Sequence, residues 1–387
     1  MKSAYGLKIP EPDYELTSVA PGTPCGELLR RYWMPVCLSD DLKDLPKRVR
    51  ILGEELIAFR DGQGRAGLLF FRCSHRGTSL EYGKVEERGI RCCYHGWLYD
   101  VTGNILDMPL EPAGSPFKNY IQHPCYPVRE FGGLVFAYMG PLDKMPEFPI
   151  YDVWTQPGKT LKARMGPRVG GAVDCNWVQS QENIVDALHI LWLHTNQSGQ
   201  QLGTELYGRW PKKLEYQETE LGMKFTMTYE LPDGRAWENT WEMVMPFTVF
   251  MSYTGEPVTR KAQNIAFCVP VDDTRQIGAG IRCVSPDEDE GKSHADYGPL
   301  ARKDHSYEYT QRNPDDKEAQ EGQGPIAIHA LEHLVTSDQG VIMFRKILRE
   351  SIRAVQEGRD PKGIIRNPEN AKCVPTAAAS VVKEGAV

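Results

Sequence analysis

The chain has 387 residues, of which 41% are hydrophobic and 25% are charged. This composition is that of an ordinary globular protein, and it argues against disorder and repeat arrays, while the length suits two domains. The formal net charge is −7, and the lysines and arginines do not gather into a basic stripe. We therefore expect no nucleic acid partner.

The longest apolar stretches, such as 134–139, are far shorter than a membrane span, and the first residues lack the apolar core of a signal peptide. We expect a cytoplasmic protein without a membrane partner. The sequence contains ten cysteines, and because the cytosol keeps thiols reduced, they favour metal binding over a disulfide framework. Only Cys73, Cys92 and Cys93 lie close to histidines in the sequence.

The first part of the chain has β character. Residues 1–46 contain one predicted short helix, 26–33, and form an N-terminal segment that we expect to pack on the second domain. Beyond it, β-branched and aromatic residues flank the glycine turn 61–64, which predicts a β-hairpin. We expect an all-β domain over residues 47–155, ending in a proline-rich stretch. Its predicted strands are 49–59, 67–72, 88–92 and 133–138.

The second part mixes helices and strands. A helix is predicted over 175–193, and an apolar face at helical spacing predicts a final helix over 339–355. We expect an α+β domain over 156–370, with an antiparallel sheet, and a loose tail over 371–387. Its predicted strands are 224–230, 237–253, 264–271 and 276–284.

Two short segments carry the strongest chemical signal. Each has a cysteine followed closely by a histidine: Cys73 with His75, and Cys92 with His95. Two thiolates and two imidazoles suit either a zinc site or a [2Fe-2S] cluster in which histidines bind one iron. A classical zinc finger has both cysteines in one loop and both histidines on a helix. Here each loop supplies one ligand of each kind, which favours the cluster.

These loops resemble the Rieske motif of the ring-hydroxylating oxygenases. Cys93 is a competing ligand, but only Cys92 has the family's spacing to His95. The extra cysteines that form a disulfide in the Rieske proteins of respiratory complexes are replaced by Thr78 and Tyr94. The residues that match the family's motif beside the ligands are Arg76, Gly77, Tyr94, Gly96 and Trp97.

A second candidate site lies in the predicted helix 175–193. Asp186 and His189 are three residues apart and share a helix face, and His194 follows after five more residues, a step that requires a loosened helix. Two imidazoles and a carboxylate form the facial triad of non-haem iron(II) oxygenases. Histidines in an apolar helix are more often core residues, and the upstream Rieske motif makes us prefer the metal site.

The resemblance implies a role for each residue of this segment. His189 and His194 would bind the mononuclear iron. Asp186 would be the electron-transfer bridge, accepting hydrogen bonds from His189 and from a cluster histidine, His95, of the next subunit. For the third iron ligand the resemblance favours Asp316, with Asp315 next. Asp304 and Asp338 are further candidates, although Asp338 is better explained as a helix N-cap.

The resemblance is best to the phthalate dioxygenase and O-demethylase branch. It implies a catalytic domain of the helix-grip type, with Fe(II), and a homotrimer supplied with electrons by an NADH-dependent reductase carrying flavin and a plant-type [2Fe-2S] centre. The implied reaction is O2-dependent ring hydroxylation of an aromatic acid. Oxidative O-demethylation is one alternative, and a Rieske electron-transfer protein is another. Trp192, Phe247 and Phe250 are candidates for an apolar substrate pocket.

Overall fold

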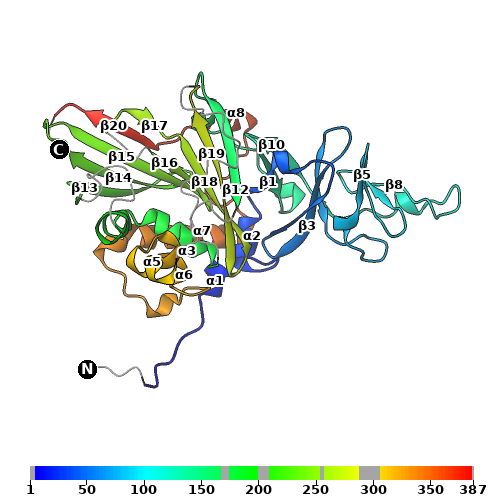
Figure 1. Ribbon diagram of the computed structural model, residues 1–387, viewed down its shortest axis with the longest axis horizontal. Coiled ribbons are helices and arrows are strands. Elements are labelled where there is room, and N and C mark those ends of the chain that lie inside the picture. Colours follow the sequence, from blue (N-terminus) through cyan, green and yellow to red (C-terminus); the bar gives the residue numbers. More distant parts are fainter. Residues whose placement is uncertain (1–4, 167–173, 199–208, 253–256, 287–305, 386–387) are drawn as a thin grey trace.

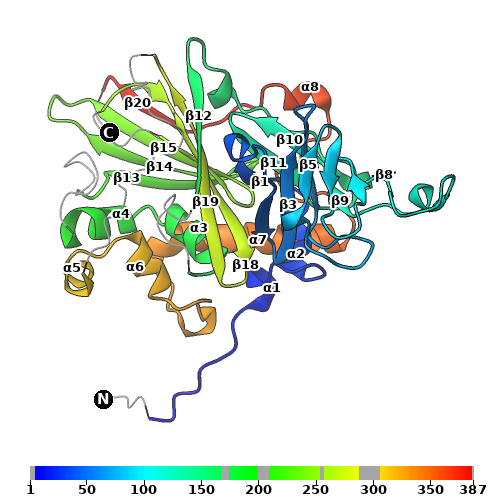
Figure 2. The same cartoon turned by 45° about the vertical axis from the view of Figure 1, so that its right-hand side comes forward.

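The computed structural model of the chain describes residues 5–166, 174–198, 209–252, 257–286 and 306–385. The molecule is elongated, with a lobe built from small sheets at one end and a large sheet covered by helices at the other (Figure 1). Figure 2 shows the same separation after a rotation of 45°. This is the α+β organisation that the sequence predicts.

The small lobe holds two four-stranded antiparallel sheets. The predicted hairpin around the turn 61–64 is confirmed, because β3 and β4 pair there. Residue 52 ends the predicted strand 49–59 early: Leu52 and Gly53 have φ of 51° and 78° and form a tight turn, so two strands replace one. The first sheet contains β2 (Lys47–Ile51), β3 (Glu54–Arg60), β4 (Ala66–Phe70) and β9 (Cys125–Tyr126). The second contains β5 (Lys84–Glu86), β6 (Gly89–Arg91), β7 (Leu98–Tyr99) and β8 (Ile105–Asp107).

A three-stranded sheet lies between the lobe and the large sheet. The predicted helix 26–33 is shorter than expected, because α2 ends at Leu29. Trp33 begins a strand that pairs with residues 134–138. Phe136 of this sheet packs edge-on against Phe267 of the large sheet, with ring centroids 5.7 Å apart. The elements here are α1 (Tyr14–Thr17), α2 (Pro24–Leu29), β1 (Trp33–Leu38), β10 (Val128–Phe131) and β11 (Leu134–Tyr138).

The large sheet has nine antiparallel strands among the described residues, along the path β12-β19-β18-β16-β15-β14-β13 with β17 and β20 attached. The single strand predicted over 237–253 is two, because the turn at Pro246 separates β15 from β16. The strands are β12 (Thr160–Gly166), β13 (Lys213–Glu218), β14 (Gly222–Glu230), β15 (Ala236–Val244), β16 (Thr248–Met251), β17 (Arg260–Lys261), β18 (Asn264–Asp272), β19 (Arg275–Val284) and β20 (Ala379–Lys383).

The prediction of a loose tail over 371–387 is wrong. Strand β20 pairs with both β15 and β17, and Ser380 at its start is fully buried. The Trp237 indole N–H donates to Ser380 Oγ over 2.7 Å, a contact between residues far apart in sequence. The tail lacks a periodic pattern because its short strand is stabilised by the sheet that it joins rather than by its own residues.

Helices cover one face of the large sheet (Figure 1). The predicted final helix is confirmed as α7, whose apolar face is buried and whose Phe344 contacts Trp177 of α3 edge-on. Among the described residues no helix has both the length and the apolar character that crossing a bilayer needs. The helices on this side are α3 (Trp177–Val185), α4 (His189–Leu191), α5 (Tyr307–Arg312), α6 (Asp316–Glu321) and α7 (Gln339–Gln356), and α8 (Pro368–Ala371) lies further along the chain.

Candidate metal centres

The two cysteine-histidine loops share one backbone design. In each loop the cysteine carbonyl accepts a hydrogen bond from a glycine amide four residues later, Gly77 for Cys73 over 2.9 Å and Gly96 for Cys92 over 3.1 Å. Both glycines have φ near +75°, a conformation in which other residues are strained. The glycines of the motif are therefore required by the tight turn that brings each histidine back beside its cysteine.

The four candidate cluster ligands are arranged with sulfur inside and nitrogen outside. The side chains of Cys73 and Cys92 are buried, whereas the imidazole rings of His75 and His95 lie near the surface with centroids 4.4 Å apart. Burial and the neighbouring Cys73 raise the pKa of Cys92 to about 11. Two neighbouring buried thiols lose their protons only when a cation lies beside them. The set of two sulfurs and two imidazoles therefore fits a [2Fe-2S] cluster. Cys93 is exposed and stands apart from this set.

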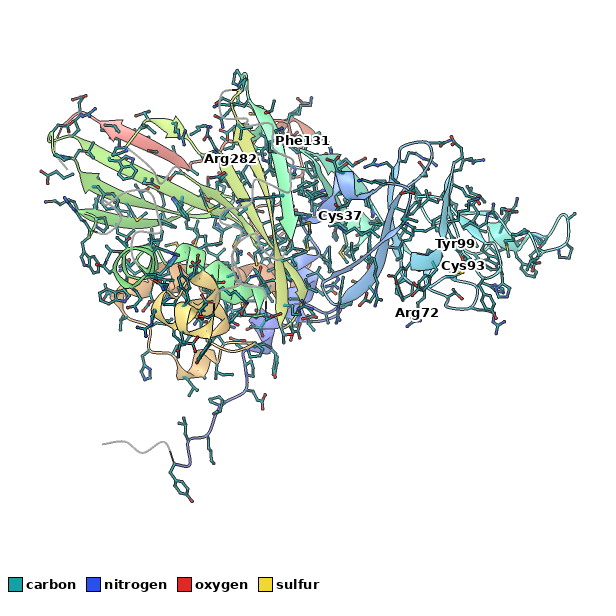
Figure 3. The ribbon with its side chains drawn as sticks, in the orientation of Figure 1. Cys37, Arg72, Cys93, Tyr99, Phe131 and Arg282 are labelled. Atoms are coloured by element: carbon teal, nitrogen blue, oxygen red, sulfur yellow. The ribbon has the colours of Figure 1, made fainter. Side chains whose placement is uncertain are left out.

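Two aromatic residues support the cluster loops. The Tyr99 hydroxyl lies 3.0 Å from Cys73 Sγ, and Trp97 stacks on the His75 ring with centroids 4.7 Å apart. Figure 3 shows Tyr99 and Cys93 within the small lobe. A hydroxyl that donates to a cluster sulfur stabilises the additional electron of the reduced state, so Tyr99 is placed to raise the reduction potential.

His123 contacts the first cluster loop, although the residues around it in the sequence do not indicate this contact. The Phe70 carbonyl can only accept, so His123 Nε2 carries the proton of their 2.9 Å hydrogen bond. Burial lowers the pKa of His123, which keeps it neutral. Its Nδ1 then accepts a hydrogen bond from the Ser74 hydroxyl over 2.8 Å. Ser74 lies between the candidate ligands Cys73 and His75 in the sequence.

The second candidate centre unites His189, His194 and Asp316, whose ligand atoms all lie within 4.8 Å of one another. Nε2 of His194 is 3.2 Å from Asp316 Oδ1, and Nε2 of His189 is 3.6 Å from the same oxygen. Burial acts to raise the pKa of Asp316, but the hydrogen bond from His194 and the charges of both histidines outweigh it and lower this pKa. The result is a carboxylate and two imidazoles facing one point, which fits a divalent iron ion.

The helix around these histidines is irregular, as the five-residue spacing predicts. α3 ends at Val185, Asp186 leaves the helical conformation, and α4 begins at His189. Residues 192–197 then form a π-helix, whose wider turn brings His194 to the side of His189. One continuous helix over 175–193 would have placed the two rings on different faces.

Contacts between α3 and α6 bring Asp316 to the histidines from more than a hundred residues away. The Gln179 amide donates to the carbonyls of Gln320 and Gly324 over 2.9 and 3.0 Å. The Asn183 amide donates to Asp316 Oδ1 over 3.1 Å and fixes the orientation of the carboxylate. α3 therefore positions Asp316, the third candidate ligand, and the other two, His189 and His194, follow α3 in the sequence.

The other aspartates considered as ligands have different roles. Asp315 caps α6, accepting a hydrogen bond from the Asp316 amide over 2.8 Å, and its carboxylate lies 3.8 Å from His194 Nδ1. Asp338 accepts from the Val335 amide over 2.6 Å and does not cap α7 through its side chain, contrary to expectation. Asp304 lies outside the described residues.

Asp186 is placed beside the histidine in a different way from that expected. His189 Nδ1 donates to the backbone carbonyl of Asp186, not to its carboxylate. The carboxylate accepts instead from the amides of Leu188 and His189 over 3.1 and 3.3 Å. Burial raises the pKa of Asp186, with a further contribution from Asp338 that the charge of His189 opposes. The backbone contact still fixes the ring so that Nε2 faces Asp316.

The structure places the three candidate substrate-pocket residues in different surroundings. Trp192 is 65% exposed. Phe247 packs against Tyr32 and Phe250 against Tyr151, with ring centroids 6.3 and 4.9 Å apart. Both phenylalanines belong to the main hydrophobic core, and Phe250 faces away from its neighbour Met251 because side chains alternate between the two faces of a strand. An apolar residue on a strand says nothing by itself about which face it occupies.

A third acidic cluster, Glu182 with His329 and Glu332, also has metal-like geometry. Arg345, however, donates to both carboxylates, to Glu182 over 2.8 Å and to Glu332 over 2.6 Å. A guanidinium already neutralises these carboxylates, so the cluster is an ion-pair network that ties α3 to α7.

Comparison with known proteins agrees with this geometry. Residues 32–127 match the Rieske [2Fe-2S] domain family. The chain is 41% identical to the tert-butanol monooxygenase / tert-amyl alcohol desaturase oxygenase subunit of Aquincola tertiaricarbonis over 87% of this chain and 76% of the relative. It is 40% identical to the phenoxybenzoate dioxygenase subunit alpha of Ectopseudomonas oleovorans over 95% of this chain and 91% of the relative.

Solved structures share the fold. The NdmA QL mutant of Pseudomonas putida CBB5 with caffeine has a TM-score of 0.64 at 21% identity, covering 93% of this chain and 98% of the other. The chain therefore belongs to the Rieske non-haem iron oxygenases, as an oxygenase subunit. The cofactors of this family are a Rieske [2Fe-2S] cluster and a mononuclear iron, for which both donor sets described above are suited.

The hydroxyl of Tyr99 provides a first test of the cluster site. Replacing Tyr99 by Phe should lower the reduction potential of the cluster, since the reduced state loses a hydrogen bond at sulfur. Spectroelectrochemical titration of the purified protein measures the potential. Tyr82→Phe is the matched control, because Tyr82 is 70% exposed. Equal potentials for Tyr99→Phe and the wild type would show that the hydroxyl does not act on the cluster.

Neighbouring aspartates provide a second test. Asp316→Ala should lower the metal content from about three irons to about two per chain while about two labile sulfides remain. Asp315→Ala should keep the iron and instead destabilise α6, at a cost of about 0.5–2 kcal/mol for a lost N-cap. Iron and sulfide analysis together with urea unfolding separates the two effects. If Asp315→Ala loses the iron and Asp316→Ala keeps it, Asp315 and not Asp316 is the third iron ligand.

Proposed function

We propose that the chain is the terminal oxygenase of an electron-transfer system in which an NADH-dependent reductase, carrying flavin and a plant-type [2Fe-2S] centre, supplies the electrons. The convergence of His189, His194 and Asp316 carries this proposal, because an electron carrier needs no second set of metal ligands. A cytoplasmic location suits a partner that uses NADH. Ten free cysteines also suit a reducing compartment.

The residues divide into two ligand sets. Cys73 and Cys92 hold one iron of the cluster and His75 and His95 hold the other, while the triad holds the mononuclear iron. The bound cofactors supply the redox chemistry: the cluster stores an electron, and the iron activates O2. The protein holds the ligands in position and places the Tyr99 hydroxyl beside the Cys73 sulfur.

Hydrogen bonds around the triad keep its geometry fixed. The Asp186 carbonyl holds Nδ1 of His189, so only Nε2 is directed to the metal position. The Asn183 amide occupies one side of Asp316 Oδ1, which leaves the carboxylate little freedom to rotate. Ligands that are fixed in this way keep an open face of the metal for O2 and substrate.

We further propose a homotrimer in which the cluster of one subunit serves the iron of the next, with Asp186 as the bridge to His95 of a neighbouring subunit. Within one chain the cluster loops lie in the small lobe, whereas α3 and α6 lie against the large sheet (Figures 1 and 2). Exposed apolar side chains occur at both ends and suit a contact between subunits. They are Leu110, Phe117 and Tyr120 on the small lobe, and Leu331, Leu334, Val335 and Ile342 beside α7.

The reaction that we propose is ring hydroxylation of an aromatic acid, as the name of the phenoxybenzoate dioxygenase relative suggests. Oxidative O-demethylation of a methoxy-aromatic acid is the second candidate, because another relative is named as a 5,5'-dehydrodivanillate O-demethylase oxygenase subunit and both reactions need the same metal ligands. Only the orientation of the substrate over the iron separates them.

Turnover under 18O2 should distinguish these reactions. With NADH, a reductase and 3-phenoxybenzoate, ring dihydroxylation is expected to give a product with two labelled atoms. With 3-methoxybenzoate, demethylation would release formaldehyde that carries one labelled atom, with the other reduced to water, and would leave 3-hydroxybenzoate unlabelled. Mass spectrometry of both mixtures decides between them, and a holoenzyme with full iron that oxidises neither class would contradict an aromatic substrate.

Subunit mixing should test the proposed bridge. Asp316→Ala removes the mononuclear iron and Cys92→Ala removes the cluster, so each variant alone should be inactive. Co-expression of the two chains with different affinity tags should restore part of the activity, because an intact cluster then lies beside an intact iron in a neighbouring subunit. A matched mixture in which the iron-bearing chain also carries Asp186→Asn should stay inactive. An inactive first mixture of correctly assembled trimers would contradict transfer between subunits.

A further inference from the structure

His123 is a fully buried histidine of the small lobe that belongs to neither candidate ligand set. Its backbone is fixed on two sides. Its amide donates to the Gly103 carbonyl over 2.8 Å, and the carbonyl of the next residue, Pro124, accepts from the Phe70 amide over 2.9 Å. A Cβ at Gly103 would lie 2.0 Å from the His123 carbonyl oxygen, so only glycine permits this approach. The imidazole therefore has a fixed origin between β4 and the turn that follows β7.

Both ring nitrogens of His123 have a defined partner. Nε2 donates to the Phe70 carbonyl at the end of β4, and Nδ1 accepts from the Ser74 hydroxyl. A buried ring with two partners keeps one orientation, because rotation would leave both nitrogens unpaired. His123 thus fixes the side chain of Ser74, a residue of the otherwise exposed loop between Cys73 and His75.

Ser74 in turn faces Tyr99 through its backbone. Burial and the hydrogen bond to Cys73 raise the pKa of Tyr99, and a hydrogen bond from the Ser74 amide opposes this rise. The Tyr99 hydroxyl thus lies between the Ser74 amide and Cys73 Sγ, which is 3.0 Å away. The His123 ring also packs on the Tyr99 ring, with centroids 4.5 Å apart and planes tilted by 36°. His123 therefore contacts both the loop and the ring that place this hydroxyl.

The position of the hydroxyl matters for the cluster. A cysteine that binds iron carries no proton, so the Tyr99 hydroxyl can only donate to Cys73 Sγ. This hydrogen bond stabilises the reduced cluster, and it weakens steeply when the two atoms separate or lose their alignment. A continuous series of contacts then leads from His123 through Ser74 and Tyr99 to the sulfur.

We propose that His123 is a positioning residue that raises the reduction potential of the cluster, because it holds Ser74 where Ser74 keeps the Tyr99 hydroxyl on Cys73 Sγ. The imidazole is neutral, so its effect comes from geometry and not from charge. The inference goes beyond the oxygenase function. It concerns the cluster alone, and it depends neither on the substrate nor on the assembly of subunits.

Two amide replacements separate the hydrogen bonds of the ring. The amide of His123→Asn lies near the position of Nδ1 and can accept from Ser74, whereas that of His123→Gln reaches the position of Nε2 and can donate to Phe70. Spectroelectrochemical titration of the cluster-loaded protein should show a lower potential in His123→Gln. The electron affinity should fall about 2- to 10-fold, and tenfold corresponds to about 59 mV for one electron. His123→Asn should lie closer to the wild type.

A double-mutant cycle tests the route through Tyr99. Ser74→Ala removes the hydroxyl bound to Nδ1 while the His123 ring stays in place, and it should also lower the potential. In the Tyr99→Phe background no hydroxyl reaches the sulfur, so neither His123→Gln nor Ser74→Ala should lower the potential further. Ser74→Ala also decides the question if His123→Gln does not fold.

Ile57→Val is the matched control. Ile57 is fully buried in the core of the same lobe, and a smaller apolar side chain loosens the packing without removing a hydrogen bond. This variant should unfold at a lower urea concentration and keep the wild-type potential. Four results would overturn the inference: a wild-type potential in His123→Gln or Ser74→Ala, equal falls in His123→Asn and His123→Gln, an undiminished fall in the Tyr99→Phe background, or the same fall in Ile57→Val.

Discussion

The packing of α6 against α3 is the contact on which the candidate iron site depends. Gln179, buried within α3, donates to two backbone carbonyls at the end of α6 and holds that helix in place. A rotation of α6 by one residue would exchange Asp316 for its neighbour, which already serves as the helix cap. A buried amide with both of its donors satisfied resists such a shift, because breaking either bond leaves an unpaired carbonyl inside the protein.

The two metal centres have opposite requirements, and the chain meets them in separate places. The cluster loops need sulfur away from water and histidine rings near the surface, which a thin lobe of short strands provides. The candidate iron triad needs three ligands held together, and the helices that cover one face of the broad sheet carry them. Since both centres must exchange electrons, this separation makes association between subunits part of the proposed function.

Sequence reasoning reached furthest where the candidate ligands are local. Cys73 with His75 and Cys92 with His95 each lie within one turn, so spacing alone indicates their chemistry. The same holds for His189 and His194, whose five-residue step predicted the irregular helix that is found. The apolar face of α7 and the hairpin of β3 and β4 are local patterns too, and both were predicted at the right place.

Features that depend on distant residues were missed or misjudged from sequence. The short strand β20 was taken as a loose tail, His123 showed no link to the cluster loops, and no local pattern indicated that Phe247 and Phe250 pack against Tyr32 and Tyr151. Periodicity identifies a strand, but only the assembled sheet decides which neighbours pair with it and which of its faces meets the helices. The sequence therefore determined the metal chemistry of the protein. The tertiary structure alone decided which side chains surround it, because those contacts join residues far apart along the chain.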